Sequence, residues 1–410
     1  MFGFANFLLL ALFAAAVFDL IFALARGSGL RGALHGLWNT PHLLFGQQLA
    51  EWRLQLGRIL FAAGLAAYEI SVVFCNSMAR QNWAWVQGVM SPVLEWLAFL
   101  CFGAKILFGT RYTWRELLAG GALYFIARWV YFNSQNIWWI GIVVAVLAAK
   151  DVPLRRPLQV YFASGCAAMA VVLALHFAGI VAPDLTSERM GALRGTYGYG
   201  HPNTFGGLVF GLVLAYALLR AQKVRWVDCL LVFAVGVFLL VGPASRSAAL
   251  CTLALAVGLV FCRLRVGHSV PRWWPGTCAG MVGLTAAVSY LLPLLVIKVG
   301  PWNNDIGPAW LAKLDSLLTC RISLTWMAYR LLDVKIAGQV FNWPTVDNSF
   351  AFALFQFGPV VAALLGILFA AALWGHAKQG RRVEVCCLFA MLAYAYMEAV
   401  SYTHLRAHET

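Results

Sequence analysis

The chain has 410 residues, of which 62% are hydrophobic and 11% are charged, and its mean hydropathy is +0.78. Soluble domains carry about 45–50% apolar and about 25% charged residues, so the polar side chains here are too few to cover a water-soluble globule. Intrinsic disorder, a collagen repeat and a small disulfide-rich scaffold are excluded by the same composition. The net charge of +14 is typical of basic cytoplasmic loops in a membrane protein, rather than of nucleic-acid binding.

The apolar residues are collected in twelve runs, and a membrane-spanning helix needs about 20 such residues. The predicted spans are 3–25, 59–76, 91–109, 117–133, 136–149, 158–182, 204–219, 226–242, 247–262, 276–297, 349–374 and 385–399. The runs are continuous rather than alternating, which predicts helices and not a β-barrel. The expected fold is therefore all-α: a polytopic integral membrane protein with about 12 transmembrane helices.

The distribution of Lys and Arg predicts the orientation of these spans. Nineteen of these side chains fall in the loops after the odd-numbered spans, and nine fall on the other side. The positive-inside rule places the larger set in the cytoplasm. Two large loops, at about 183–203 and 298–348, are then expected to face outward, as is Met1.

We divide the chain into three parts. Residues 1–57 hold an N-terminal hydrophobic segment and a polar cytoplasmic stretch, and residues 58–399 form the transmembrane core. Residues 400–410 resemble the translation of a sequencing adapter. We therefore expect the natural protein to continue differently past Glu398, and we give the histidines of this tail no weight as metal ligands.

Polar groups at or near membrane depth are functional candidates by default, and the first collection of them is the segment 189–207. It reads RMGALRGTYGYGHPNTFGG, and its glycines let the backbone bend close to a ligand. Arg194, His201 and Asn203 are its candidates for binding or catalysis. The alternative is a tight loop in which His201 and Asn203 bind only local backbone groups.

The second collection is the turn GPASRS at 242–247, which opens the ninth predicted span. Arg246 offers a planar fork of donors suited to phosphate oxygens. A helix N-terminus adds partial positive charge that favours an anion. The alternative is an arginine that only reaches to the membrane interface.

The third collection is the outer loop 298–348, which contains Arg321. The amphipathic stretch Arg321–Val340 is predicted to lie as a helix on the outer surface. Asp347 and Asn348 stand directly before the eleventh span. Asp347 either caps the first turn of that helix or is the external carboxylate best placed to take a proton from a hydroxyl. No Walker loop, HExxH or GxSxG motif accompanies these residues.

Four strings carry a resemblance to a known family: Arg194 with GYGHPNTFG, the PASRS turn, LDSLLTCRISL and VDNSFAFALFQFG. Together they resemble the O-antigen polymerase and ligase superfamily over most of 58–399, and most of all the Wzy-type polymerases of capsular and exopolysaccharides. The ligase branch carries a His-Asn pair followed by nine residues and a glycine. Here Asp347-Asn348 is followed by nine residues and Gly358, so an Asp stands where ligases have a His, which favours a polymerase.

The resemblance implies a GT-C-like membrane glycosyltransferase that needs no metal, nucleotide sugar or other cofactor. Its donor would be a polyprenyl-pyrophosphate-linked oligosaccharide at the outer face of the bacterial cytoplasmic (inner) membrane. Its partners would be membrane lipid, a flippase and a chain-length regulator, and no nucleic acid. The implied roles are pyrophosphate binding for Arg194, Arg246 and Arg321, base for Asp347 with His201 as the alternative, and substrate binding for Asn203 and Asn348.

Two other functions stay open from the sequence. One is a ligase that moves finished glycan to another acceptor. The other is a flippase or transporter of lipid-linked sugar, which should show related repeats and intramembrane charges lining a pathway. The intramembrane ionisable residues are instead scattered, at Asp19, Glu69, Glu95, Arg128 and Asp228. The concentration of polar groups in the outer loops favours an external catalytic site.

Overall fold

The computed structural model describes residues 2–25, 29–46, 51–181, 187–189, 192–264, 270–296, 308–318, 320–341 and 346–398. The expected adapter-derived tail lies outside these ranges. The chain divides into two compact units, which we describe separately: unit 1 comprises Met1–Cys75 and Trp83–Met169, and unit 2 comprises Asn76–Asn82 and Ala170–Thr410. In the described ranges the only strands form two short antiparallel pairs, β1–β2 and β3–β4, and the rest of the regular structure is helical.

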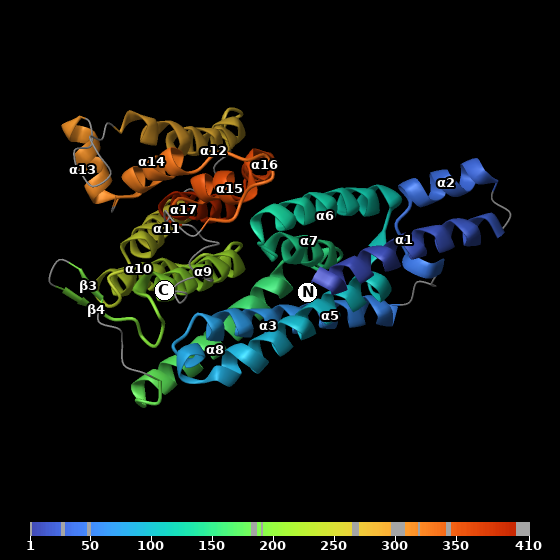
Figure 1. The fold of residues 1–410 in the computed structure, drawn as a ribbon, viewed down its shortest axis with the longest axis horizontal. Coiled ribbons are helices and arrows are strands. Elements are labelled where there is room, and N and C mark those ends of the chain that lie inside the picture. Colours follow the sequence, from blue (N-terminus) through green and yellow to red (C-terminus); the bar gives the residue numbers. More distant parts are fainter. Residues whose placement is uncertain are drawn as a thin grey trace. The chain divides into compact units, whose positions relative to one another are not determined.

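Unit 1 is built around two helices that run side by side, α3 and α5 (Figure 1). Its elements are α1 Phe2–Ala25, α2 Leu30–Asn39, β1 His42–Leu43, η1 Leu44–Gly46, α3 Glu51–Cys75, η2 Val86–Met90, α5 Ser91–Phe108, β2 Arg111–Tyr112, α6 Trp114–Ser134, α7 Trp138–Ala149 and the first part of α8 Arg155–Phe177. A Cβ added to Gly64 of α3 would lie 3.0 Å from the carbonyl oxygen of Ala98 on α5. Small residues at this crossing therefore let the two backbones approach closely.

Unit 2 contains the three polar segments that the sequence singled out: 189–207, 242–247 and the stretch from Arg321 to Asn348. Its elements are α4 Ala79–Asn82, the end of α8, β3 Ser187–Arg189, β4 Ala192–Arg194, α9 Pro202–Arg220, α10 Trp226–Val241, α11 Arg246–Leu264, α12 Trp274–Leu291, η3 Leu292–Leu295, α13 Ala309–Leu317, α14 Arg321–Leu331, α15 Ser349–Phe357, α16 Pro359–Lys378 and α17 Arg382–Met397. Its largest buried apolar cluster joins α9, α10, α11 and α17. Three of these helices also carry polar groups considered below, at the start of α9, at the start of α11 and directly after α17.

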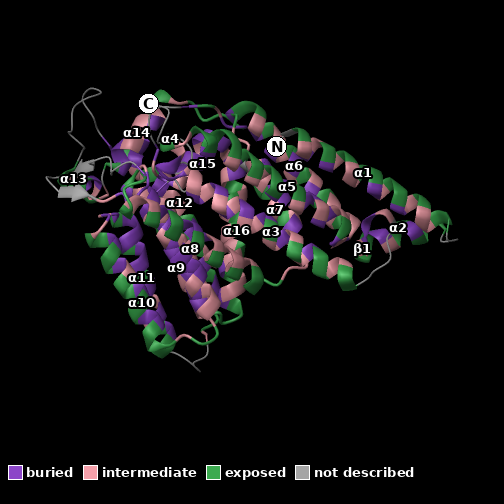
Figure 2. Ribbon diagram, turned by 90° about the horizontal axis from the view of Figure 1, so that it is seen from below, coloured by how far each residue is buried: buried purple, intermediate pink, exposed green. Residues whose placement is uncertain are grey.

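Eight helical segments in the described residues are long and apolar enough to cross a membrane. They are Gly3–Ala25, Glu51–Cys75, Val86–Phe108, Arg155–Phe177, Pro202–Arg220, Arg246–Leu264, Trp274–Leu295 and Pro359–Lys378. Figure 2 shows exposed positions recurring along α1 and α10, and these include large apolar side chains such as Phe13 and Val241. Apolar surface of this extent is compatible with lipid rather than water. The chain is an all-α protein embedded in a membrane.

The twelve predicted runs all coincide with helices, but four of those helices fall short of a spanning segment by length or hydropathy. These four are α6, α7, α10 and α17. The closely joined pair α6 and α7, whose predicted runs at 117–133 and 136–149 are short, is among them. Eight spans is therefore the number that helix length and hydropathy support in the described part of the chain.

The prediction of one continuous span over 349–374 is wrong, because the helix breaks at Gly358 between α15 and α16. Gly358 has a φ of +86°, and a Cβ there would lie 2.1 Å from the carbonyl oxygen of Ile336. Gly338 faces the same crossing, where its own Cβ would lie 2.0 Å from the carbonyl oxygen of Gln356. Two glycines thus allow the backbone of the preceding loop to contact the chain closely where α15 ends. Pro359 is at the first turn of α16, where a backbone N–H would have no partner within the helix, so its missing N–H removes no hydrogen bond.

The predicted surface helix over Arg321–Val340 is also wrong in length and in exposure. Helix α14 ends at Leu331, and the chain continues through a turn in which the Gly338 N–H donates to the carbonyl of Lys335 at 3.0 Å. Buried positions along α14 include Ile322 and Ala328. The amphipathic pattern could not reveal that the chain must turn to bring Gly338 against the α15–α16 break.

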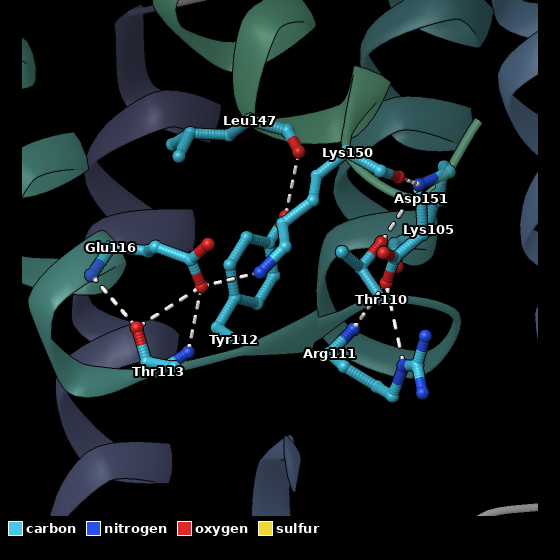
Figure 3. Close-up of polar contacts among 9 residues, drawn as sticks. All are labelled: Lys105, Thr110, Arg111, Tyr112, Thr113, Glu116, Leu147, Lys150 and Asp151. Carbon is cyan, nitrogen blue, oxygen red and sulfur yellow. Dashed lines mark hydrogen bonds and ion pairs between the residues drawn. The ribbon is translucent and has the colours of Figure 1, made fainter. Parts of the chain in front are cut away.

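A dense polar cluster ties β2 to the ends of α5 and α7 in unit 1 (Figure 3). The fully buried Lys105 donates to Thr110 Oγ1 at 2.8 Å and to the carbonyl of Lys150 at 2.7 Å. Lys150 in turn pairs with Glu116, whose carboxylate also accepts the N–H of Thr113 in a capping box that starts α6. Every polar atom named here has a protein partner, so this cluster is a structural one.

We predict that Lys105→Ala destabilises the protein, because Thr110 and the Lys150 carbonyl would stay buried without their donor. Hydrogen bonds to a charged group contribute about 1.5–3 kcal/mol each. Thermal unfolding of the purified protein in detergent checks this, with Arg156→Ala, an exposed basic position on α8, as the matched control. An unchanged melting temperature for Lys105→Ala would contradict the structural role.

Candidate functional site

The glycine-rich segment before His201 is folded tightly against the start of α9. The Met78 N–H donates to the carbonyl of Gly198 at 2.8 Å, and the Tyr197 ring stacks on Phe205 with 5.0 Å between centroids. Tyr199 is fully buried beside the same phenylalanine. These contacts lie just before His201 and so determine where α9 begins.

His201 and Asn203 sit in the first turn of α9 but serve different partners. His201 is the N-cap of the helix: its exposed side chain accepts the Asn203 N–H through Nδ1 at 3.1 Å. The Asn203 side chain instead donates through Nδ2 to Glu398 Oε1 at 3.0 Å. Binding of a local backbone group, which the sequence offered as the alternative for both residues, is therefore observed for the side chain of His201. The side chain of Asn203 instead contacts Glu398, which is distant in the sequence.

The PASRS turn packs directly on the same part of α9. A Cβ added to Gly206 would lie 2.3 Å from Ser245 Oγ, so only glycine permits this approach. The Ser245 hydroxyl lies 3.5 Å from Asn203 Oδ1, which accepts from it. Arg246 opens α11 with an exposed side chain, and the next residue, Ser247, is buried.

Arg321 is positioned by a separate local structure at the start of α14. Cys320 adopts a left-handed conformation with a φ of +64°, and the buried Asp315 on α13 accepts the N–H groups of Ile322 and Ser323 at 2.8 and 3.1 Å. A carboxylate at this place both caps the helix and complements its dipole. The buried Arg321 guanidinium therefore extends from the first position of a well-anchored helix.

Arg321 forms an ion pair with Glu398, the residue directly after α17. Its Nη2 lies 2.6 Å from Glu398 Oε1 and 3.2 Å from Ser247 Oγ, and its Nη1 donates to the carbonyl of Leu318 at 2.9 Å. Both side chains of the pair are more than 90% buried. The Ser349 hydroxyl donates to the backbone carbonyl of Glu398 at 2.5 Å.

We call this assembly the Arg321–Glu398 cluster. Its members are Asn203, Ser245, Ser247, Arg321, Ser349 and Glu398. They come from the N-terminal ends of α9, α11, α14 and α15 and from the C-terminal end of α17. Four helix N-termini therefore meet at one buried ion pair, and each brings partial positive charge.

Asp347 lies beside this cluster, and it is not the cap that the sequence suggested. Asn348 caps α15, because its Oδ1 accepts the N–H groups of Phe350 and Ala351 at 2.9 and 3.1 Å, while its Nδ2 donates to Ser289 Oγ at 3.1 Å. Both polar atoms of the Asn348 amide thus have protein partners. Asp347 is left half-buried, and in the described part of the chain no hydrogen bond to its carboxylate is found.

The protonation of Glu398 depends on burial and on two charged neighbours, Arg321 and Asp347. Burial raises the pKa of the Glu398 carboxyl to about 7; the Arg321 charge opposes this rise and the Asp347 charge adds to it. Burial also raises the pKa of Asp347 above its usual value, and Arg321 again opposes the rise. One arginine therefore faces two carboxyl groups, and its charge opposes the rise of both pKa values.

The structure brings together some of the predicted site residues and leaves others apart. Asn203, Arg321 and Asp347 meet at the cluster, and Asn348 lies next to them with a capping role. His201 and Arg246 lie on adjoining helix ends with exposed side chains. Arg194 ends β4, and its side chain lies outside the described part of the protein.

Sequence reasoning missed Glu398, the acceptor on which the cluster converges. A usable signal was present: a lone carboxylate at the end of the last apolar run, on the side of the membrane predicted for the outer loops. Polar residues at such depth are functional candidates by default. In the sequence alone, Glu398 marks only the point past which the natural protein is expected to continue differently.

The arrangement suits an anion beside a base. Among the described residues no group of three or more His, Cys, Asp or Glu side chains is placed to hold a metal ion. Comparison with known proteins adds no assignment: no family model, curated protein or solved structure matches this chain. Any functional conclusion must come from the chemistry of these residues.

We predict that Arg321→Ala destabilises the protein by about 3–5 kcal/mol, because Glu398 would be left as an uncompensated buried charge. The double variant Arg321→Ala/Glu398→Gln removes that charge and should recover part of the loss. Melting temperatures of both variants and of Glu398→Gln in one detergent form the double-mutant cycle. Strictly additive effects would show that the two side chains are not coupled.

Proposed function

We propose that this protein is a membrane polysaccharide polymerase that joins polyprenyl-pyrophosphate-linked oligosaccharide repeat units. The observation that carries the proposal is that a buried arginine, Arg321, lies near the carboxylate of Asp347 at a place where four helix N-termini converge. Among the described residues, no hydrogen-bond partner of the Asp347 carboxylate is found. The resemblance of the same segments to Wzy-type polymerases supports this choice of chemistry. A GT-C-type, metal-independent reaction follows from that resemblance.

The donor pyrophosphate is assigned to Arg321 and the surrounding helix N-termini. A guanidinium offers planar, charge-assisted hydrogen bonds to phosphate oxygens, and helix N-termini favour anions. In the absence of donor, Glu398 occupies Arg321 at 2.6 Å and keeps the guanidinium oriented in its buried site. Arg246 and Arg194, which belong to adjoining segments, extend this anion site in the proposal.

Asp347 is assigned as the general base. The acceptor sugar hydroxyl attacks the anomeric carbon of the donor, and its proton passes to the Asp347 carboxylate. The bond from the anomeric carbon to the pyrophosphate oxygen breaks, and the pyrophosphate leaves with the electron pair, stabilised by Arg321. Asn203 and Asn348 act in this proposal by holding the cluster and α15 in place.

The reaction is proposed to occur at the outer face of a bacterial cytoplasmic membrane, since the Lys and Arg distribution over the twelve predicted spans puts the N-termini of α9, α11 and α15 on that side. A flippase would supply the lipid-linked repeat unit there, and a chain-length regulator would limit the product. A ligase would use the same donor chemistry on a different acceptor. The acceptor is therefore what separates the two activities.

The test uses the purified protein in nanodiscs with a lipid-linked oligosaccharide as both donor and acceptor. Growth of the lipid-linked chain together with release of free polyprenyl pyrophosphate supports a polymerase. Release that requires a different added acceptor identifies a ligase. No release with either acceptor, from protein with a normal melting temperature, rejects the glycosyltransferase proposal.

We predict that Asp347→Asn lowers turnover by about 10²–10⁴-fold, the contribution typical of a general base. Because only the deprotonated base is active and its pKa is raised, wild-type turnover should fall on acidification at a pH above the usual Asp range near 4. The pH profile of wild-type turnover checks the assignment, and an acidic limb within the usual Asp range would contradict it.

A further inference from the structure

An apolar groove lies between α12, α15 and α16, three helices that are neighbours in unit 2 (Figure 1). It consists of two adjoining hollows of about 180 and 490 Å³, which share Val282, Tyr290, Phe350, Ala362 and Gly366 in their walls. The larger volume falls in the range of about 300–1,000 Å³ that ligand sites occupy. The groove is thus large enough to hold a ligand of some size.

The groove is open because small residues line it. A Cβ added to Gly280 or Gly283 of α12, or to Gly366 of α16, would meet no atom within 4 Å. These glycines are therefore not needed for close helix packing, in contrast to Gly206 beside the cluster. The neighbouring rim is apolar and exposed, with Leu284 and Ile367 among its side chains, as expected of a surface that faces lipid.

One end of the groove reaches the Arg321–Glu398 cluster. Ser349 and Phe350 line the smaller hollow, and Ser349 is the residue that holds the Glu398 carbonyl at 2.5 Å. From Gly280 to Tyr290 the groove follows α12 for about 15 Å at 1.5 Å per residue, which is half the hydrocarbon thickness of about 30 Å. The groove therefore runs from a charged site into the membrane interior.

We propose that this groove binds the first isoprene units of the donor's polyprenyl chain, with the pyrophosphate at Arg321. This inference rests on the proposed function and adds the lipid specificity of the same site. We expect an occupant that joins one hydrocarbon chain to a compact anion, because the groove ends at Ser349, a member of the cluster that holds the buried Arg321. A polyprenyl pyrophosphate has this form, whereas a phospholipid carries two chains on a glycerol. The small residues leave room for the methyl branches of the isoprene units.

The test fills the groove without disturbing the fold. Gly283→Leu and Gly366→Leu place a side chain into open space on two different helices, and leucine favours helix more than glycine does. Gly375→Leu is the matched control, because Gly375 lies on α16, also has no atom within 4 Å of an added Cβ, and does not line either hollow. Melting temperatures equal to the wild type establish that all three variants are folded.

Binding is measured in nanodiscs with a photoreactive polyprenyl pyrophosphate, with crosslinked peptides located by mass spectrometry. We expect crosslinks on α12 and α16, reduced at least tenfold in Gly283→Leu and Gly366→Leu and unchanged in Gly375→Leu. A photoreactive phosphatidylglycerol should label these positions weakly and should not compete. Equal labelling by the phospholipid, or undiminished polyprenyl labelling in both groove variants, overturns the proposal.

Turnover of the same variants separates this inference from the proposed function. If the wild type forms polymer and both groove variants keep its KM for the lipid-linked donor, the groove assignment fails while the polymerase stands. If the groove labels as expected but the wild type transfers no sugar, the polymerase fails and a polyprenyl site stands. A raised KM in the groove variants, with the control unchanged, supports both.

Discussion

The buried ion pair between Arg321 and Glu398 is the interaction on which the meeting of helix ends in unit 2 depends. It joins α14 to the end of α17. Hydrogen bonds from Asn203 and Ser349 to Glu398, and from Arg321 to Ser247, connect the pair to the first turns of α9, α15 and α11. Isolated charges are too costly to bury, so each partner needs the other, and the helices that carry them must meet. A pair of this kind contributes specificity of arrangement more than net stability.

The same pair gives the site its chemical character. Arg321 is held where four helix N-termini add positive potential, and the two carboxyl groups next to it keep raised pKa values. Polar groups elsewhere have structural roles: Asp228 caps α10 and pairs with Arg220 at 3.1 Å, and Lys105 donates to Thr110 and to the carbonyl of Lys150 in unit 1. The convergence of four helix N-termini on a buried arginine beside two carboxyl groups is what distinguishes the Arg321–Glu398 cluster from these structural ones.

Much of the helical architecture could be predicted from the sequence, because a membrane requires long apolar runs and these are visible in the composition. The α15–α16 break could not, since it depends on loop backbone near Ile336 pressing against Gly358. For the site, the external polar segments predicted Asn203, Arg321 and Asp347, which do meet. Asn348 rather than Asp347 is the cap of α15, and the sequence did not predict Glu398 as a site residue. Tertiary packing decides which of two adjacent polar residues turns inward and which partner it contacts, and a local sequence pattern does not contain that information.

One measurement tests most directly whether this cluster is an outward-facing pyrophosphate site. Cys320 is exposed and directly precedes Arg321, so its modification by a membrane-impermeant maleimide, located by mass spectrometry, reports on the site without any substitution. The account predicts that Cys320 reacts in intact cells, and that saturating polyprenyl pyrophosphate slows the reaction in nanodiscs. Reaction only in inverted vesicles, or a rate unaffected by the lipid, would contradict it.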